Sequence, residues 1–229
     1  MQILAIDTST EYLSLALWLD GRVLVRDVHA GQSHSQQILP TLRELLDEAK
    51  LDLDALDGIA FGAGPGSFTG LRIACGVTQG LAFGAGLPVV EVSTLQALAQ
   101  QSGAKKVIAC LDARMGEIYY AAYEKKDDVW FEVIAPALFK PERAPALQGN
   151  DWVGVGTGWL AYPEVLNQVY QDHLVEPPKP EHSSHPTALA IAEIALPVFA
   201  AGQAKAAHEV APIYIRNKVA LKMSEREKR

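Results

Sequence analysis

Two aspartates at predicted strand ends and one glycine-rich segment are residues whose types and positions could form a binding site. Asp7 and Asp112 each follow an apolar run, at the expected end of the first strand of each half of the chain. In Gly154–Gly158 three glycines would let a nucleotide approach the backbone closely, because glycine has no Cβ. Aspartates at strand ends and glycines in turns are also common in ordinary turns that bind nothing. The residues alone therefore leave a nucleotide site and ordinary turns as alternatives.

A serine nucleophile is the second chemistry to consider. The chain has no H-E-x-x-H and no G-x-S-x-G motif. Ser67 follows a glycine, but the sequence places no histidine or acid beside it, and Ser67 and Thr69 are better explained as caps of the following helix. Catalytic triads assemble in space, so a peptidase stays an alternative that no motif favours.

Metal-binding patterns are sparse. His182 and His185 are three residues apart in a proline-rich segment with no evident third ligand. Cys75 and Cys110 fit no metal or redox spacing, and we interpret them as buried thiols in a reducing cytoplasm. No secretory leader or bilayer-length apolar run is recognisable. We predict no metal site, no membrane association and a cytoplasmic location.

The first half of the chain must position Asp7. Alternating apolar residues predict strands, Asp20-Gly21 predicts a hairpin turn, and Ser33 or Ser35 and Ser93 are candidate helix caps. Pro40 is tolerable in the helix that Ser33 or Ser35 would cap if it falls in the first turn of that helix. We expect strands at Gln2–Asp7, Leu13–Leu19, Arg22–Val28, Ile59–Gly62 and Pro88–Val92, and helices at Ser35–Ala49, Thr69–Gly84 and Thr94–Gln101.

A second run of similar elements positions Asp112. We expect strands at Val107–Asp112, Glu117–Tyr123, Val129–Ile134 and Trp152–Gly156, then an alanine-rich helix near 187–202 that Pro197 should kink or shorten. The pattern predicts an α/β protein with domains at 1–103 and 104–217, and a charged tail at 218–229. The last helix would pack back on the first domain.

Glycines recur at every fourth position in the helix that follows Gly64. A glycine inside a helix costs about 1 kcal/mol relative to alanine, so a run of them calls for a compensating contact. Arg72, Gly76, Gly80 and Gly84 share one helical face and leave it nearly without side chains. Such a ridge lets another helix approach closely. Packing against the protein's own sheet and packing against another chain are both open.

Three segments carry a family resemblance. Ile6–Thr10 reads IDTST, Gly64–Arg72 reads GPGSFTGLR, and Asp112–Tyr119 reads DARMGEIY. They closely resemble the TsaB (YeaZ) family, and the similarity continues to Pro212–Arg216. The resemblance implies two ribonuclease H-like lobes facing a cleft, as in the actin, hexokinase and Hsp70 (ASKHA) superfamily.

In that superfamily, an aspartate after the first strand faces nucleotide phosphate and orients Mg²⁺-bound water, while backbone N–H groups meet the phosphates. The resemblance therefore implies a vestigial nucleotide site. Its candidate residues are Asp7, Thr8, Ser9, Asp112, Arg114, Gly116, Gly156 and Gly158. We expect no cofactor on this chain alone, with weak ATP or ADP binding favoured within a complex.

The catalytic TsaD relatives carry a His-x-x-x-His pair that holds a metal. Here the matching positions are His34 and Ile38, so the second imidazole is missing. The resemblance implies a non-catalytic partner of TsaD, in a complex that moves a threonylcarbamoyl group onto adenosine of tRNAs reading codons that begin with A. The alternative is a free-standing ATP-dependent ASKHA enzyme or a glycoprotease-like peptidase.

The resemblance also implies how the complex assembles. Two helices from each partner would pack together, a TsaE-type ATPase would join, and the same surface would give a homodimer when the partner is absent. The residues that we expect at the interface are Ile38, Leu42, Leu45, Arg72, Gly76, Gly80 and Gly84.

Charge argues against independent binding of nucleic acid. The chain carries a net charge of −7, whereas phosphate contacts need clustered Lys and Arg. The exception is the basic tail, which we interpret as a solvated end. Contact between this tail and tRNA within the complex is the alternative.

Overall fold

The first sheet is built from the N-terminal part of the chain. Our computed structural model describes residues 1–175 and 185–216. The strands are β1 (Gln2–Asp7), β2 (Tyr12–Leu19), β3 (Arg22–His29), β4 (Gly58–Gly64) and β5 (Val89–Ser93), in the order β3-β2-β1-β4-β5. β1 pairs antiparallel with β2 and parallel with β4.

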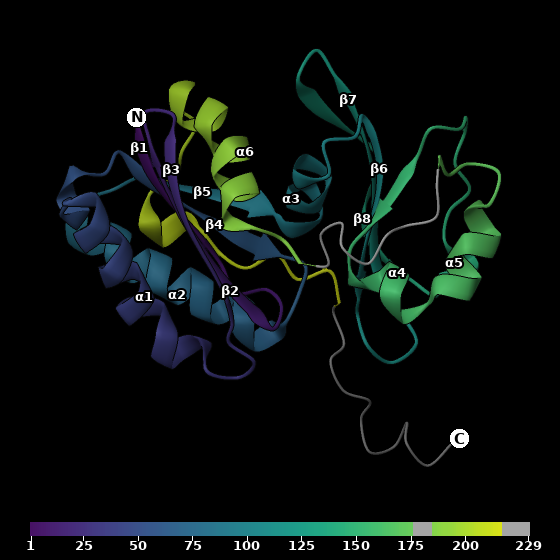
Figure 1. Cartoon of the computed structure of the whole chain (residues 1–229), viewed down its shortest axis with the longest axis horizontal. Coiled ribbons are helices and arrows are strands. Elements are labelled where there is room, and N and C mark those ends of the chain that lie inside the picture. The colour runs from purple at the N-terminus through teal and green to yellow at the C-terminus, as the bar shows by residue number, and fades with distance from the viewer. Residues whose placement is uncertain (176–184, 217–229) are drawn as a thin grey trace.

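The second sheet repeats this order with one strand fewer. Its strands are β6 (Lys106–Asp112), β7 (Ile118–Lys126), β8 (Val129–Phe139) and β9 (Val153–Val155), in the order β8-β7-β6-β9. β6 pairs antiparallel with β7 and parallel with β9, as β1 does with β2 and β4. Asp7 and Asp112 therefore end equivalent strands. This mixed α/β architecture with two sheets agrees with the predicted fold class (Figure 1).

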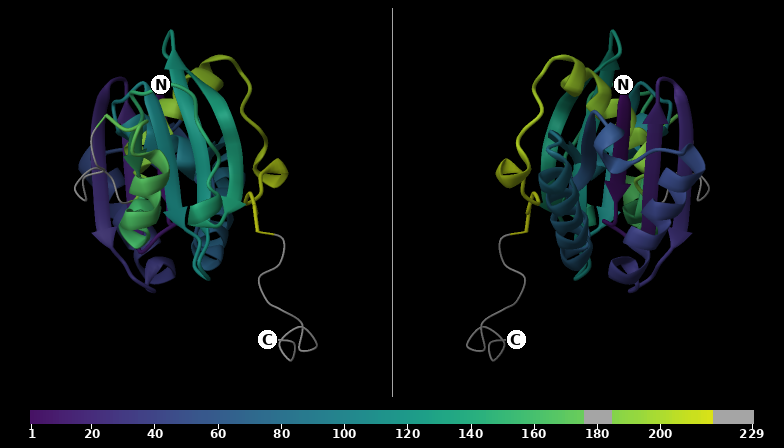
Figure 2. Two further views of the ribbon diagram at one scale, coloured as in Figure 1. Left: turned by 90° about the vertical axis from the view of Figure 1, so that its right-hand side faces the viewer. Right: turned by 90° about the vertical axis from the view of Figure 1, so that its left-hand side faces the viewer.

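Helices cover both faces of the first sheet. α1 (His34–Ala49) and α2 (Phe68–Ala85) pack on one face, and α6 (Ala188–Ala200) packs on the other. Figure 2 shows α1 and α2 together on the side of the molecule that faces away from the second sheet. α6 follows the second sheet in sequence but returns to the first. The domain boundaries given above stay a prediction.

The second sheet is covered by α3 (Thr94–Gln101) on one face and by α4 (Thr157–Ala161) and α5 (Pro163–Tyr170) on the other. Short 3-10 turns lie at Leu53–Ala55, Pro141–Arg143 and Ala207–Glu209. The sequence analysis predicted neither α4 nor α5. α4 has only five residues, and α5, unlike α3, has no capping side chain at its start to mark it.

Local signals explain many element ends. Asp20 and Gly21 form the β2–β3 turn with positive φ values of 51° and 97°, as the primed turns of tight hairpins require. The Ser93 side chain caps α3 by accepting from the Gln96 N–H, and Thr187 caps α6 by accepting from Ala190. The Ser93 cap was predicted from the residue type, whereas the Thr187 cap was not. The prediction that the Ser33 or Ser35 side chain caps α1 is wrong, because the N-cap residue Ser33 makes no side-chain capping hydrogen bond.

Pro40 differs from the expectation. α1 begins at His34, so Pro40 lies inside the helix rather than in its first turn. Pro40 and Gln36 are both exposed. The Gln36 carbonyl, which loses its helical N–H donor to the proline, therefore lies where water can satisfy it.

Candidate functional site

A cleft of about 1000 Å³ separates the two halves. It is bordered by the N-terminal end of α2, the β6–β7 turn, α4 and the last described residues of the chain. Its lining includes Ser9, Phe68, Thr69, Asp112, Arg114, Leu160, Tyr214 and Arg216. Three of the residues predicted for a nucleotide site, Ser9, Asp112 and Arg114, are thus brought to one cavity from distant parts of the sequence.

Asp7 does not border this cleft, and its side chain is only 1% exposed. Its Oδ1 accepts hydrogen bonds from the Ser9 N–H at 2.9 Å and the Ser9 hydroxyl at 2.8 Å. Its Oδ2 is buried without a hydrogen-bond partner, and it lies so close to Gly62 that a Cβ there would come within 2.0 Å. Burial raises the pKa of the Asp7 carboxyl from 3.8 to about 7. In this fold Asp7 is a core residue rather than a cleft-facing carboxylate.

The Asp7 pKa predicts a pH-dependent stability. Between pH values of about 4 and 7 the folded protein keeps a proton that the unfolded chain has lost, so stability should fall as the pH rises through this window. Asp7→Asn keeps an oxygen for the two Ser9 donors and should remove this dependence. Urea denaturation at pH 5 and pH 8 measures it. Asp54→Asn, at an exposed carboxylate, should behave as wild type. An equally steep decline in the Asp7→Asn variant would contradict the assignment.

Thr8 and Ser9 hold two of the resembling segments together. The Thr8 hydroxyl donates to the Gly70 carbonyl at 2.7 Å, and the Ser67 N–H donates to the Ser9 carbonyl at 2.7 Å. A Cβ at Gly70 would lie 1.8 Å from the Thr8 carbonyl oxygen. Thr8 is fully buried and does not border the cleft. Close packing of two backbone segments therefore accounts for this threonine and this glycine.

Gly156 and Gly158, two residues predicted for a nucleotide site, do not border the cleft and pack closely against β6. A Cβ at Gly156 would lie 2.2 Å from the Cys110 carbonyl oxygen, and one at Gly158 would lie 2.7 Å from the Cys110 Cβ. β6 therefore occupies the space that a Cβ at either position would need. Cys110 and Cys75 are themselves buried thiols, as predicted.

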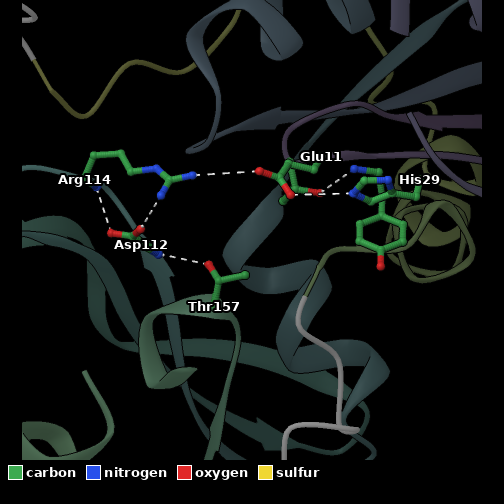
Figure 3. Close-up of polar contacts among 7 residues, drawn as sticks. Glu11, His29, Asp112, Arg114 and Thr157 are labelled. Carbon is green, nitrogen blue, oxygen red and sulfur yellow. Dashed lines mark hydrogen bonds and ion pairs between the residues drawn. The ribbon is translucent and has the colours of Figure 1, made fainter. Parts of the chain in front are cut away.

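The second half contributes a charged wall to the cleft (Figure 3). Asp112 Oδ1 accepts from the Arg114 N–H at 2.9 Å, and its Oδ2 lies 3.3 Å from the Arg114 guanidinium. The Asp112 N–H donates to the Thr157 hydroxyl at 3.0 Å. Arg114 also reaches Glu11 of the first half at 4.0 Å, and Glu11 lies 3.7 Å from the His29 ring. Gly116 lies beside this cluster in the turn, with a positive φ of 76° and open space around it.

The C-terminal segment is the part of the cleft that the sequence did not predict. The Ile213 N–H donates to the Ala63 carbonyl at 2.7 Å, next to β4. The Tyr214 hydroxyl accepts from Arg72 at 2.9 Å, and Arg216 forms an ion pair with Glu117 at 2.5 Å. The segment thus joins the two halves. The sequence of this segment, Pro212–Arg216, resembles that of the family, but it has no helical or strand periodicity from which its position in the fold could be predicted.

No metal cluster forms within the described ranges. Within 1–175 and 185–216, no group of three or more His, Cys, Asp or Glu side chains is arranged to hold an ion. His34 is 5% exposed and its Nε2 lies 3.2 Å from the Tyr12 carbonyl oxygen. His185 stacks on the Tyr12 ring, whereas His182 and the tail 218–229 lie outside the described residues.

The glycine ridge of α2 faces outward. Arg72, Gly76, Gly80 and Gly84 are exposed, and a Cβ added at any of the three glycines would meet no atom within 4 Å. The nearby Phe83 side chain is 82% exposed. Packing against the protein's own sheet is therefore excluded as the reason for these glycines.

Three predicted interface residues are placed differently, which corrects that part of the prediction. Ile38, Leu42 and Leu45 are 1%, 3% and 0% exposed and belong to the core between α1 and the first sheet. The apolar stripe of α1 faces inward because it buries the apolar side chains on this face of the first sheet. Leu39, at 52% exposure, lies on the outer side of the helix instead.

Comparison with known proteins gives strong similarity along almost the whole chain. The profile of the family described as "TsaD: tRNA N6-adenosine threonylcarbamoyltransferase" matches residues 28–222. The chain is 42% identical to the tRNA threonylcarbamoyladenosine biosynthesis protein TsaB of Escherichia coli (strain K12), over 97% of each chain. This chain belongs to the TsaB family.

Two further TsaB-family relatives agree. The TsaB protein of Haemophilus influenzae is 38% identical over 97% of this chain and 96% of its own. The solved structure of YeaZ from Pseudomonas aeruginosa has a TM-score of 0.81 at 40% identity and covers 93% of this chain and 99% of that one. Among the helices of the described residues, none is both long and apolar enough to span a membrane.

Proposed function

We propose that this chain is the non-catalytic subunit of a bacterial complex that forms threonylcarbamoyladenosine on tRNAs reading codons that begin with A. The observation that carries the proposal is the near full-length identity of 42% to a protein named for this biosynthesis. The partners would be a TsaD-type transferase and a TsaE-type ATPase, with tRNA bound only through the complex in the cytoplasm.

The repeated sheet order supports the ASKHA part of the proposal. Each half starts with an antiparallel pair of strands and adds a parallel strand beside the first one. Two ribonuclease H-like lobes facing a cleft would have this arrangement. The second lobe would be the reduced one, because its sheet has four strands among the residues that the structure describes.

The open ridge of α2 supports pairing with another chain. Three exposed glycines on one helical face let a second helix approach closely. The exposed side of α1 lies beside α2 (Figure 2) and would join the four-helix packing. A second copy of this chain would use the same surface when the partner is absent.

Two observations support a non-catalytic role. Ile38, which stands where the catalytic relatives have a second histidine, is packed in the core, and the ring of His34 is turned to the Tyr12 carbonyl. Asp7 and Thr8 lie beneath the cleft surface rather than on it. The cleft itself keeps the ATP-dependent enzyme as a second candidate, because Ser9, Asp112 and Arg114 border it together.

A reconstitution assay tests the proposal. A TsaD-type protein with a TsaE-type protein should transfer threonylcarbamoyl to tRNA only when this chain is added, and this chain alone should transfer nothing. Purified alone, it should also show neither ATP turnover nor peptidase activity. Transfer that is independent of the chain, or turnover by the chain alone, would refute the proposal.

A further inference from the structure

Arg72 contacts two neighbouring aromatic rings at the N-terminal end of the glycine ridge, with its guanidinium over the face of Phe68 and beside Tyr214. Its Cζ lies 3.8 Å from the centre of the Phe68 ring and 5.9 Å from that of Tyr214. Its Nε–H donates to the Tyr214 hydroxyl at 2.9 Å. The centres of the two rings are 5.4 Å apart. Phe68 is 42% exposed and Tyr214 is 43% exposed. The guanidinium is therefore oriented in advance and still accessible.

Among the residues that the structure describes, the Arg72 guanidinium has no carboxylate partner. Across the ranges 1–175 and 185–216, no ion pair joins Arg72 to an acid, whereas Arg26, Arg43, Arg114 and Arg216 each have at least one. Arg72 is also the sole charged residue of the 18-residue helix α2. A planar guanidinium with one N–H engaged can still offer its other donors to a carboxylate, often two at once.

The surroundings of Arg72 fit a protein helix better than RNA. Toward the C-terminus the ridge continues as Gly76, Gly80 and Gly84, with Phe83 exposed beside it. Phosphate backbones are bound by clusters of cations, whereas α2 has a single cationic residue, Arg72. An uncharged ridge with one cation at its end instead matches a helix that has small or apolar residues and one acidic side chain.

We propose that Arg72 is the charge anchor of the α2 docking surface, and that it binds an Asp or Glu on a helix of the TsaD-type partner. This inference rests on the proposed function, because it names the chemistry of that partner at the same surface. The acid would fix the position and direction of the partner helix along the ridge, while the glycines allow close contact. Tyr214 is a positioning residue, since it holds the guanidinium in place.

Calorimetric titration of the partner into this chain at several salt concentrations tests the inference. Arg72→Gln should weaken binding at least about tenfold and flatten its salt dependence. Arg72→Lys should lie between wild type and Arg72→Gln, because it keeps the charge but loses the planar fork. Tyr214→Phe should weaken binding less than Arg72→Gln. The matched control is Arg143→Gln, at an exposed arginine of the second half, which should bind as wild type.

A charge swap identifies the partner residue. Arg72→Glu should abolish binding, and replacing the opposing acid of the partner by arginine should restore it. Thermal melting of every variant confirms folding. If wild type binds no TsaD-type protein, the proposed function itself fails.

Binding of wild type with unchanged binding of Arg72→Gln overturns the anchor alone. Loss of tRNA affinity at unchanged partner binding would show that Arg72 contacts phosphate. Loss of self-association alone would show that the occupant is a second copy. Either result overturns the inference.

Discussion

Replacing Gly80 with leucine is expected to abolish pairing with a TsaD-type partner, and homodimerisation, while the fold survives. A Cβ at Gly80 meets no atom within 4 Å, so the new side chain projects from the ridge and holds the approaching helix away. The monomer should gain helix propensity worth up to about 1 kcal/mol. Sedimentation velocity measures the pairing, and thermal melting measures the stability.

Two further variants separate a steric effect from a general one. Gly80→Ala adds a single methyl group and should weaken pairing less than leucine does. Gln168→Leu places the same side chain on an exposed position of α5, in the second half, and should pair normally. A Gly80→Leu protein that melts far below wild type yet still pairs would show that the ridge is not an interface.

Alanine at Gly156 is expected to destabilise the protein strongly. The residue has a positive φ of 98°, and its Cβ would lie 2.2 Å from the Cys110 carbonyl oxygen. Backbone strain and overpacking each cost about 1–3 kcal/mol. Their sum, about 2–6 kcal/mol, is a large part of the free energy of unfolding of a typical domain, which is roughly 5–15 kcal/mol. Urea denaturation followed by circular dichroism measures the loss.

Gly116→Ala is the matched control, because Gly116 also has a positive φ, 76°, but no atom near its Cβ. It should lose only the strain energy of about 1–2 kcal/mol. Equal stabilities of the two variants would show that the contact with Cys110 does not constrain Gly156. A Gly156→Ala protein of normal stability with reduced nucleotide binding would restore the original assignment of this glycine.

The local elements could be predicted from the sequence because local rules determine them. Asp20-Gly21 can form a tight turn with positive φ, and Ser93 can cap a helix, wherever the rest of the chain lies. A short apolar run likewise predicted β1, and a period-two pattern predicted β2. The resemblance of three short segments was enough to predict the TsaB family, which the comparisons confirm.

Sequence patterns alone could not show which face of an element meets which neighbour. The stripe with Ile38 and Leu45 and the ridge with Gly80 both looked suited to a partner, but the sheet covers the stripe and nothing in the described chain covers the ridge. Periodicity identifies a face and cannot name what lies against it.

Long-range packing also decided the cleft. Tyr214 is 142 residues from Arg72 in the sequence, and no local rule places it there. The Asp7 carboxylate lies beneath the cleft, against β4, because Gly62 has no Cβ that would exclude it. Gly156 likewise has no Cβ, which leaves room for the Cys110 carbonyl oxygen. The sequence by itself determined the family and the local elements, since these depend on neighbouring residues. Only the tertiary structure decided which residues face the cleft, the core or a partner, because that depends on which distant segments fill the same space.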